Sequence, residues 1–282
     1  MQDFKEDVLN SLMERRKFLK ATSLATVGIA GASLLGGALP MAAQGPGSPG
    51  SPVPLSANDA AILNFALNLE YLEAEFYTVC TTGNTISQIG IGVSGVGNEG
   101  PTYGGQKVNF GANPDKVITI AEQIAEDEQT HVKLLRTLLG SQAIAKPTIN
   151  LAALGTASTV AEFLALARAF EDVGVSAYGG AAPLVQSSSV LAIAARIALT
   201  EGEHTGNLRL LVALNNVTTT KVDAQDVLPP PSGSQYFSNV AALTIVRNTS
   251  EVLAIVYGKG TAGTDSGGFF PDGVNGSINT VA

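Results

Sequence analysis

The sequence predicts an all-α fold, a four-helix bundle in which one long crossover joins two helical hairpins. Its only two histidines, His131 and His204, each end a Glu-x-x-His tetrad, which begins at Glu128 in the first case and at Glu201 in the second. A glutamate-containing segment of helical period precedes each tetrad. The resulting order, Glu, Glu-x-x-His, Glu, Glu-x-x-His, indicates a duplicated helical hairpin of the kind that holds two metal ions.

Six side chains of these segments are candidate metal ligands. Residues three apart share a helix face, so each tetrad presents a carboxylate oxygen and an imidazole nitrogen to one point. Burying such groups is costly unless they are paired or bind a metal. Carboxylate and imidazole without thiolate favour iron or manganese, and we expect two such ions. The predicted ligands are Glu70, Glu128, His131, Glu171, Glu201 and His204.

The two halves of the duplication suggest how the ligands divide. Glu128 and Glu201 are expected to lie between the metals, with the upstream glutamates and the histidines each on one metal. Glu73, three residues after Glu70, is an alternative ligand on the same face. The repeat favours Glu70, because Glu73 aligns with Gly174 in the second half. Nearby Glu75 is expected to be solvated.

A tyrosine follows each upstream glutamate by seven residues, Tyr77 after Glu70 and Tyr178 after Glu171. Seven residues is nearly two turns, so each pair shares a helix face. The tyrosines are candidate catalytic residues that hydrogen-bond a ligand carboxylate or transfer an electron. The alternative is packing, with the hydroxyl bonded across the bundle.

Two aspartates adjoin candidate ligands. Asp127 precedes Glu128, and Asp172 follows Glu171. Either side chain could orient a metal-bound imidazole through a hydrogen bond. The alternative is an exposed aspartate with no contact to the site.

The first hairpin is predicted from its caps and breakers. Ser56 begins a helix over 57–80, and a Gly-rich segment without helical period follows at 81–113. That segment either has its own small structure or is a surface insertion. The Asn113-Pro114 pair begins the second helix, which ends before Gly140.

The second hairpin follows a long crossover. A Thr-x-x-Glu capping box at Thr159 begins the third helix, which is expected to end near Gly179 and Gly180. The fourth helix spans 188–214, and the bundle as a whole spans 57–216. Residues 217–282 form a C-terminal extension with one short helix, packed on the bundle or on a second subunit.

The N-terminal region predicts export. Residues 1–43 combine Arg15 and Arg16 with a mildly apolar run and small residues near Ala42, which is typical of a twin-arginine signal peptide. An uncleaved membrane anchor is the alternative. Residues 44–56 form a Pro/Gly/Ser linker. The protein is therefore expected in the periplasm or outside the cell.

Charge and cysteine content exclude some functions. The formal net charge of −8, without a basic stripe, argues against nucleic-acid binding. The single cysteine, Cys80, excludes an intrachain disulfide. The expected partners are a small-molecule oxidant or Fe(II), with a homo-oligomer as a further expectation.

The motifs above resemble the ferritin-like superfamily, and more narrowly the exported bacterial ferritin-like proteins related to desiccation-related proteins. Besides the ligand pattern, the stretches at 67–77 and 250–258 are similar to that group. The resemblance implies a ferritin-like bundle over 57–215, with dinuclear iron or manganese chemistry on peroxide, dioxygen or Fe(II). The long loop at 81–113 and the C-terminal extension depart from a minimal ferritin subunit and argue against an iron-storage cage.

Three functions are consistent with this resemblance. The first is an exported oxidoreductase in envelope stress protection. The second is a non-catalytic stress-associated structural or binding protein whose metal site stabilises the bundle. The third is metal storage, which would require a large regular assembly.

Overall fold

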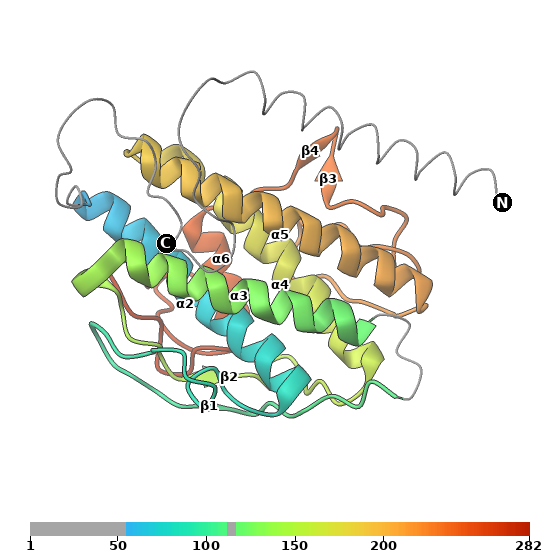
Figure 1. Cartoon of the computed structure of the whole chain (residues 1–282). Coiled ribbons are helices and arrows are strands. Elements are labelled where there is room, and N and C mark those ends of the chain that lie inside the picture. The colour runs from blue at the N-terminus through green and yellow to red at the C-terminus, as the bar shows by residue number, and fades with distance from the viewer. Residues whose placement is uncertain (1–54, 112–116) are drawn as a thin grey trace, which may run out of the picture. The chain divides into compact units, whose positions relative to one another are not determined.

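Four long helices form the bundle in the computed structural model, which describes residues 55–111 and 117–282. They are α2 (Ala57–Thr82), α3 (Val117–Leu139), α4 (Val160–Ala181) and α5 (Ser188–Leu214). The pairs α2–α3 and α4–α5 make the most extensive contacts, as expected for two hairpins (Figure 1). The predicted all-α four-helix bundle is confirmed.

The helix starts follow the predicted capping chemistry. The Ser56 hydroxyl accepts a hydrogen bond from the Asp59 amide, and Ser187 caps α5 in the same way. Thr159 and Glu162 form the predicted reciprocal capping box of α4. The Asn113-Pro114 start of α3 lies outside the described residues.

The third helix ends within one residue of the predicted position, although the two glycines there do not stop it. α4 continues through Gly179 and Gly180 to Ala181, followed by the 3₁₀ turn η2 (Ala182–Leu184). These glycines serve packing instead, because a Cβ on Gly180 would collide with the Arg247 carbonyl oxygen. At the end of α3, Gly140 has a φ of 55° and opens the 3₁₀ turn η1 (Gly140–Gln142).

The Gly-rich segment after α2 and the crossover after α3 pair with each other. Strand β1 (Thr102–Tyr103) lies parallel to β2 (Ile149–Asn150) below α2 and α3 (Figure 1). The segment contributes buried apolar side chains to the core: Ile86, Ile91, Val93, Val108 and Phe110. It therefore has its own packed structure, one of the two predicted alternatives.

Glu75 corrects the sequence prediction. It was expected to be solvated, yet it is fully buried. One carboxylate oxygen accepts a hydrogen bond from the Ile86 amide at 3.1 Å, and the other lies 3.6 Å from Lys146 Nζ. Glu75 therefore joins α2 to both long connections.

The C-terminal extension packs on the bundle of its own chain. Helix α6 (Thr249–Val256) lies against α4, and Phe269 and Phe270 are buried in the core. Strands β3 (Asn239–Val240) and β4 (Leu243–Thr244) form an antiparallel hairpin beyond α5 (Figure 1). The packing matches the first of the two placements that the sequence left open.

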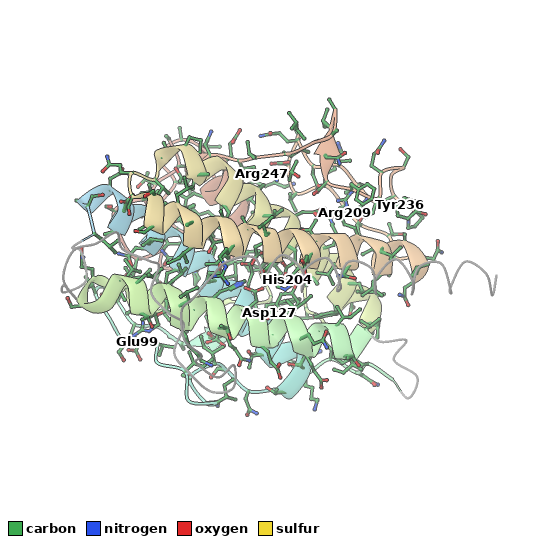
Figure 2. The ribbon with its side chains drawn as sticks, turned by 45° about the horizontal axis from the view of Figure 1, so that its top comes forward. Glu99, Asp127, His204, Arg209, Tyr236 and Arg247 are labelled. Carbon is green, nitrogen blue, oxygen red and sulfur yellow. The ribbon has the colours of Figure 1, made fainter. Side chains whose placement is uncertain are left out.

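Arginine–aspartate contacts fix this extension in place. Arg168 of α4 donates to Asp226 at 2.8 and 2.9 Å. Arg209 of α5 donates to the Tyr236 carbonyl at 3.0 Å, and Figure 2 shows these two residues together.

None of the helices in the part of the chain that the structure describes has the length and hydrophobicity of a membrane-spanning segment.

Candidate metal centre

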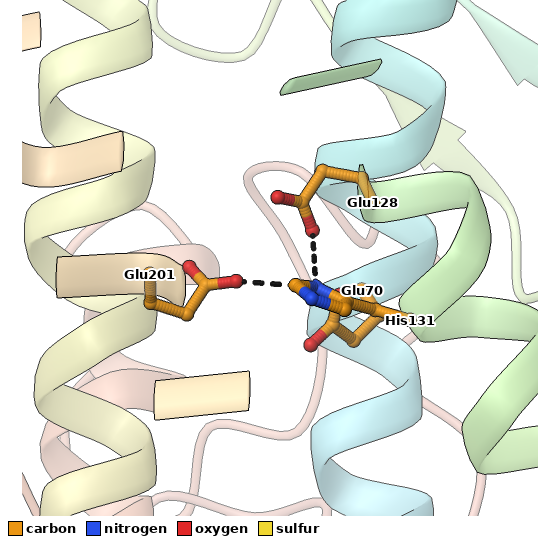
Figure 3. A group of neighbouring side chains, drawn as sticks. All are labelled: Glu70, Glu128, His131 and Glu201. Carbon is orange, nitrogen blue, oxygen red and sulfur yellow. Dashed lines mark hydrogen bonds and ion pairs between the residues drawn. The ribbon is translucent and has the colours of Figure 1, made fainter. Parts of the chain in front are cut away.

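The six predicted ligand side chains meet in the middle of the bundle. They form two groups of four, and within each group one ligand atom per residue lies within 4.8 Å of all the others. The first group is Glu70, Glu128, His131 and Glu201, shown in Figure 3, and the second is Glu128, Glu171, Glu201 and His204. Glu128 and Glu201 belong to both groups, so the two groups are adjacent and share carboxylates.

Around His131, three carboxylates converge on one nitrogen. The Nδ1 atom lies 3.2 Å from Glu70 Oε2, 3.2 Å from Glu128 Oε2 and 3.3 Å from Glu201 Oε1 (Figure 3). One nitrogen carries at most one proton, so it cannot donate hydrogen bonds to all three oxygens. The arrangement is that of donor atoms around a common centre.

His204 has the matching environment in the second hairpin. Its Nδ1 lies 3.1 Å from Glu128 Oε1 and 3.2 Å from Glu171 Oε2. The two oxygens of Glu128 therefore face different imidazoles, which is the position predicted for a residue between two metals. The structure thus brings together all six residues that the sequence singled out.

Asp127 and Asp172 behave differently. Asp127 Oδ2 lies 3.1 Å from His204 Nε2, and Figure 2 shows the two side by side between α3 and α5. The Asp127 side chain remains 52% exposed. For Asp172 neither of the two alternatives holds, because the side chain is buried and accepts hydrogen bonds from Arg209 at 2.6 Å and from Arg168 at 3.3 Å.

Several buried oxygens of this cluster have no hydrogen-bond donor among the described residues. They are Glu70 Oε2, Glu128 Oε1, Glu171 Oε1 and both oxygens of Glu201. All four glutamates are fully buried. Buried carboxylate oxygens without donors are costly unless a cation neutralises them. The donor set therefore fits hard or borderline metal cations such as iron and manganese.

The protonation of the cluster supports the same reading. Burial lowers the pKa of His204, but Glu171 and Glu128 outweigh this and raise the pKa to about 12. Burial, with the neighbouring Glu70, raises the pKa of Glu128 to about 7. The pKa of Glu201 is raised well above its usual value by burial and then by Glu128. Groups that favour their protonated forms in this way would release protons on binding a metal cation.

The tyrosines contact the opposite hairpin. Tyr178 Oη on α4 donates a 2.5 Å hydrogen bond to Glu70 Oε1 on α2. Tyr77 Oη on α2 lies 3.5 Å from the Ala167 carbonyl oxygen of α4, and its pKa is raised well above the usual value by burial and then by Glu171. Tyr178 therefore bonds a candidate ligand, as one predicted alternative required, whereas electron transfer stays a prediction.

Glu73 is a fifth carboxyl group beside the centre, outside both groups of four. It is only 4% exposed, and its pKa is raised well above the usual value by burial and then by Glu201. Its Oε1 lies 2.7 Å from the point that a Cβ on Gly174 would occupy, and Glu201 Oε2 lies 3.0 Å from that point. The sequence signal for this arrangement was the alignment of Glu73 with Gly174.

Comparison with known proteins identifies the family of this chain and one relative. The family model described as the ferritin-like domain matches residues 58–214, more than half of the chain, so the chain belongs to the ferritin-like domain family. A relative, the ferritin-like catalase Nec2 of Nesocodon mauritianus, is 23% identical over 270 residues, which covers 78% of this chain and 84% of that protein. With its buried glutamate–histidine clusters, the chain is a metal-binding ferritin-like protein.

Proposed function

We propose that this protein is a dinuclear iron or manganese oxidoreductase that decomposes or reduces peroxide, with dioxygen or Fe(II) as the other candidate substrates. The observation that supports it most is the pair of ligand groups that share Glu128 and Glu201. Two adjacent metal positions allow transfer of two electrons at one site. The name of the catalase relative supports peroxide as the substrate.

The side chains of this chain would hold and balance the metals. Glu70 and His131 would hold one metal, and Glu171 and His204 the other, with Glu128 and Glu201 between them. When bound, the metals would supply reversible electron storage. Four carboxylates offset four positive charges, which keeps the buried site near neutrality.

Protein groups beside the ligands would handle protons and orientation. The Tyr178 hydroxyl fixes Glu70, and Asp127 fixes the His204 ring through Nε2. Peroxide decomposition needs such groups, because one peroxide gives up two electrons and two protons to become dioxygen. The second peroxide takes up these electrons and protons and becomes two waters.

The test combines metal analysis with turnover. Protein loaded with iron or with manganese is given hydrogen peroxide while dioxygen release is followed. One dioxygen per two peroxides indicates decomposition, and peroxide loss without dioxygen indicates reduction by a second substrate. Absence of peroxide, dioxygen and Fe(II) turnover by both metal forms would reject the proposal.

A structural role for the metals is the second candidate. Each of α2, α3, α4 and α5 contributes at least one residue to the cluster, so bound metals would also cross-link the bundle. A purely structural site predicts that chelation lowers the melting temperature while the metal-loaded protein shows negligible turnover. Such a protein would fit a stress- or desiccation-associated role in the cell envelope.

Export by the twin-arginine route is part of the proposal. The predicted signal at 1–43 lies outside the described residues, and it rests on Arg15, Arg16 and the apolar run that follows. Replacing both arginines by lysine should leave the protein inside the cell. A protein still exported after Arg15→Lys with Arg16→Lys would argue against this route.

A further inference from the structure

Two apolar pockets lie on either side of the contact between Glu73 and Gly174. Counted together with the solvent at their open ends, they contain about 450 and 500 Å³ of empty space. Both are lined by Leu69, Glu73 and Gly174, so this contact forms a wall that the two pockets share. The first pocket continues between α2, α4 and α6, and the second along α2 and α4 toward η2.

The linings of these pockets are almost entirely hydrocarbon. The first includes Leu72, Leu166, Phe170 and Ile255, with the 49% exposed Leu154 at its edge. The second includes Phe65, Ala66 and Ala177, and among its lining residues the polar groups are Glu73 and the hydroxyl of Tyr178. Such walls offer no replacement for the hydrogen bonds that a polar solute loses on leaving water.

The shared wall adjoins the metal centre directly. Glu73 and Gly174 occupy equivalent positions of the duplicated hairpin and meet where α2 faces α4. Because Gly174 has no Cβ, the Glu73 carboxyl occupies the space beside Glu201 Oε2. A side chain at 174 would push Glu73 into the pockets or onto the ligand Glu201.

The chemistry of the occupant follows from the lining and the site. The desolvation free energy of entering such pockets is small for an uncharged molecule of two heavy atoms that forms weak hydrogen bonds. It is large for ions, including Fe(II). Dioxygen has these properties. It is also the product of peroxide decomposition and an oxidant in the other candidate reactions.

We propose that the two pockets form the path of dioxygen to or from the metal centre, and that Glu73, in the space left by Gly174, controls passage. The path rests on the proposed function, which makes dioxygen a product or a substrate. The pair Glu73–Gly174 is then the position at which the two halves of the bundle differ in order to admit a small apolar molecule.

The first part of the test locates the pockets with xenon, which binds apolar cavities of this kind. Crystals of the metal-loaded, full-length protein are pressurised with xenon, and density is expected in both pockets. Leu166→Phe should remove xenon from the first pocket alone, and Ala66→Phe from the second alone. Absence of xenon from both pockets of the wild-type protein would overturn the path.

The second part measures passage at unchanged metal content. With both pockets filled by Leu166→Phe and Ala66→Phe, turnover should fall about tenfold, as 1.4 kcal/mol of added barrier would produce. If dioxygen is the oxidant, the fall appears as a raised KM for dioxygen; if it is the product, as slower dioxygen release. Gly174→Ala should slow turnover as well. Gly206→Ala is the matched control, because nothing lies within 4 Å of its added Cβ.

The outcomes separate the path from the function on which it rests. Filled variants that bind both metals and turn over at the wild-type rate would overturn the path and leave the redox function intact. Xenon in both pockets of a wild-type protein that turns over neither peroxide, dioxygen nor Fe(II) would overturn the redox function and the path together.

Discussion

The hairpins α2–α3 and α4–α5 repeat each other at the metal ligands and differ around them. Glu70 corresponds to Glu171, and the Nδ1 atoms of His131 and His204 each lie 3.2 Å from the upstream glutamate of their own hairpin. The matched positions all face the cluster. The unmatched positions, Glu73 against Gly174 and Asp127 against Thr200, lie immediately beside it. Equivalence therefore holds at the candidate ligands, and difference appears at their immediate neighbours.

The connections within the two hairpins also differ, in length and in packing. Residues 83–111 between α2 and α3 pair with the crossover and bury apolar side chains, whereas α4 and α5 are joined through η2 and a few residues. Glu75 and Lys146 fix the longer connection to α2. The first hairpin is thus covered by its own long connection, whereas the second is covered by the C-terminal extension, which packs on α4 and α5.

Replacing a shared ligand should have the largest effect. Glu128→Ala and Glu201→Ala each remove a carboxylate from both ligand groups, so we expect loss of both metals and a fall in turnover beyond about 100-fold, since even outer partners of ligands cost 10–100-fold. Metal analysis and peroxide consumption measure this. The control is Glu203→Ala, which changes an exposed glutamate on α5, the helix that contains Glu201. Unequal losses for the two variants would contradict the equivalence of the hairpins.

Replacing Asp127 tests whether the difference between Asp127 and Thr200 affects metal affinity at one of the two positions. Asp127→Ala removes the partner of His204 Nε2, and because this carboxylate is half exposed we expect metal affinity to fall by about tenfold, the lower end for such partners. Competition with a chelator measures it. Thr200→Ala is the matched control at the equivalent position, where the hydroxyl donates to the Arg196 carbonyl oxygen of its own helix. Equal effects of the two variants would reject a special role for Asp127.

Exchanging the residues of the Glu73–Gly174 pair should sharpen the comparison further. Gly174→Glu alone places two carboxyl groups in the space of one and should destabilise the protein by about 1–3 kcal/mol, as overpacking does. Adding Glu73→Gly should recover part of the loss, with a coupling energy of about 1–2 kcal/mol. Urea unfolding at fixed metal content measures both. Strictly additive effects would show that the two positions do not share this space.

The smallest effect is expected at the attachment of the C-terminal extension. Hydrogen bonds from Arg247, at 2.7 and 2.9 Å, outweigh burial and lower the pKa of Asp223. A lowered pKa means that the folded protein favours the carboxylate, so this stabilisation is present above the unfolded pKa of about 3.9 and is lost as pH falls through the lower folded value.

Asp223→Asn should therefore cost up to about 1 kcal/mol near pH 7, because the pair is partly exposed and screened by solvent. The difference from wild type should shrink as the pH falls below about 4. Denaturant unfolding of both proteins at each pH measures it. A difference that does not change with pH would show that Asp223 contributes by packing and not by charge.

The sequence was sufficient for the helices and for the grouping of the six candidate ligands, because both follow short-range rules. Caps at Ser56 and Thr159 mark helix starts, and the i, i+3 spacing of Glu128 and His131 fixes their common face. The burial of Glu75 was not predictable, because it depends on Lys146 from a distant connection. Of the two partners of Asp172, Arg209 was not predictable for the same reason, since it lies on another helix, whereas Arg168 lies four residues earlier on the same helix and was visible in the sequence.

The relation between the tyrosines and the glutamates shows the same limit. Sequence spacing correctly gave the face of α4 that contains Tyr178, but its partner is Glu70 of α2. The alignment of Glu73 with Gly174 was visible in the sequence as a mismatch in the repeat. The packing of α2 against α4 explains the mismatch, because the Glu73 carboxyl occupies the space that a side chain at position 174 would need, beside Glu201.

Metal content tests the central claim most directly. The full-length protein, purified without added metal and analysed by plasma mass spectrometry, should contain about two iron or manganese atoms per chain, the number that this ligand set holds in four-helix bundles. The identity of the metal would then separate iron–oxygen chemistry from catalase-like manganese chemistry. A protein that contains neither metal and takes up none on reconstitution would contradict the account.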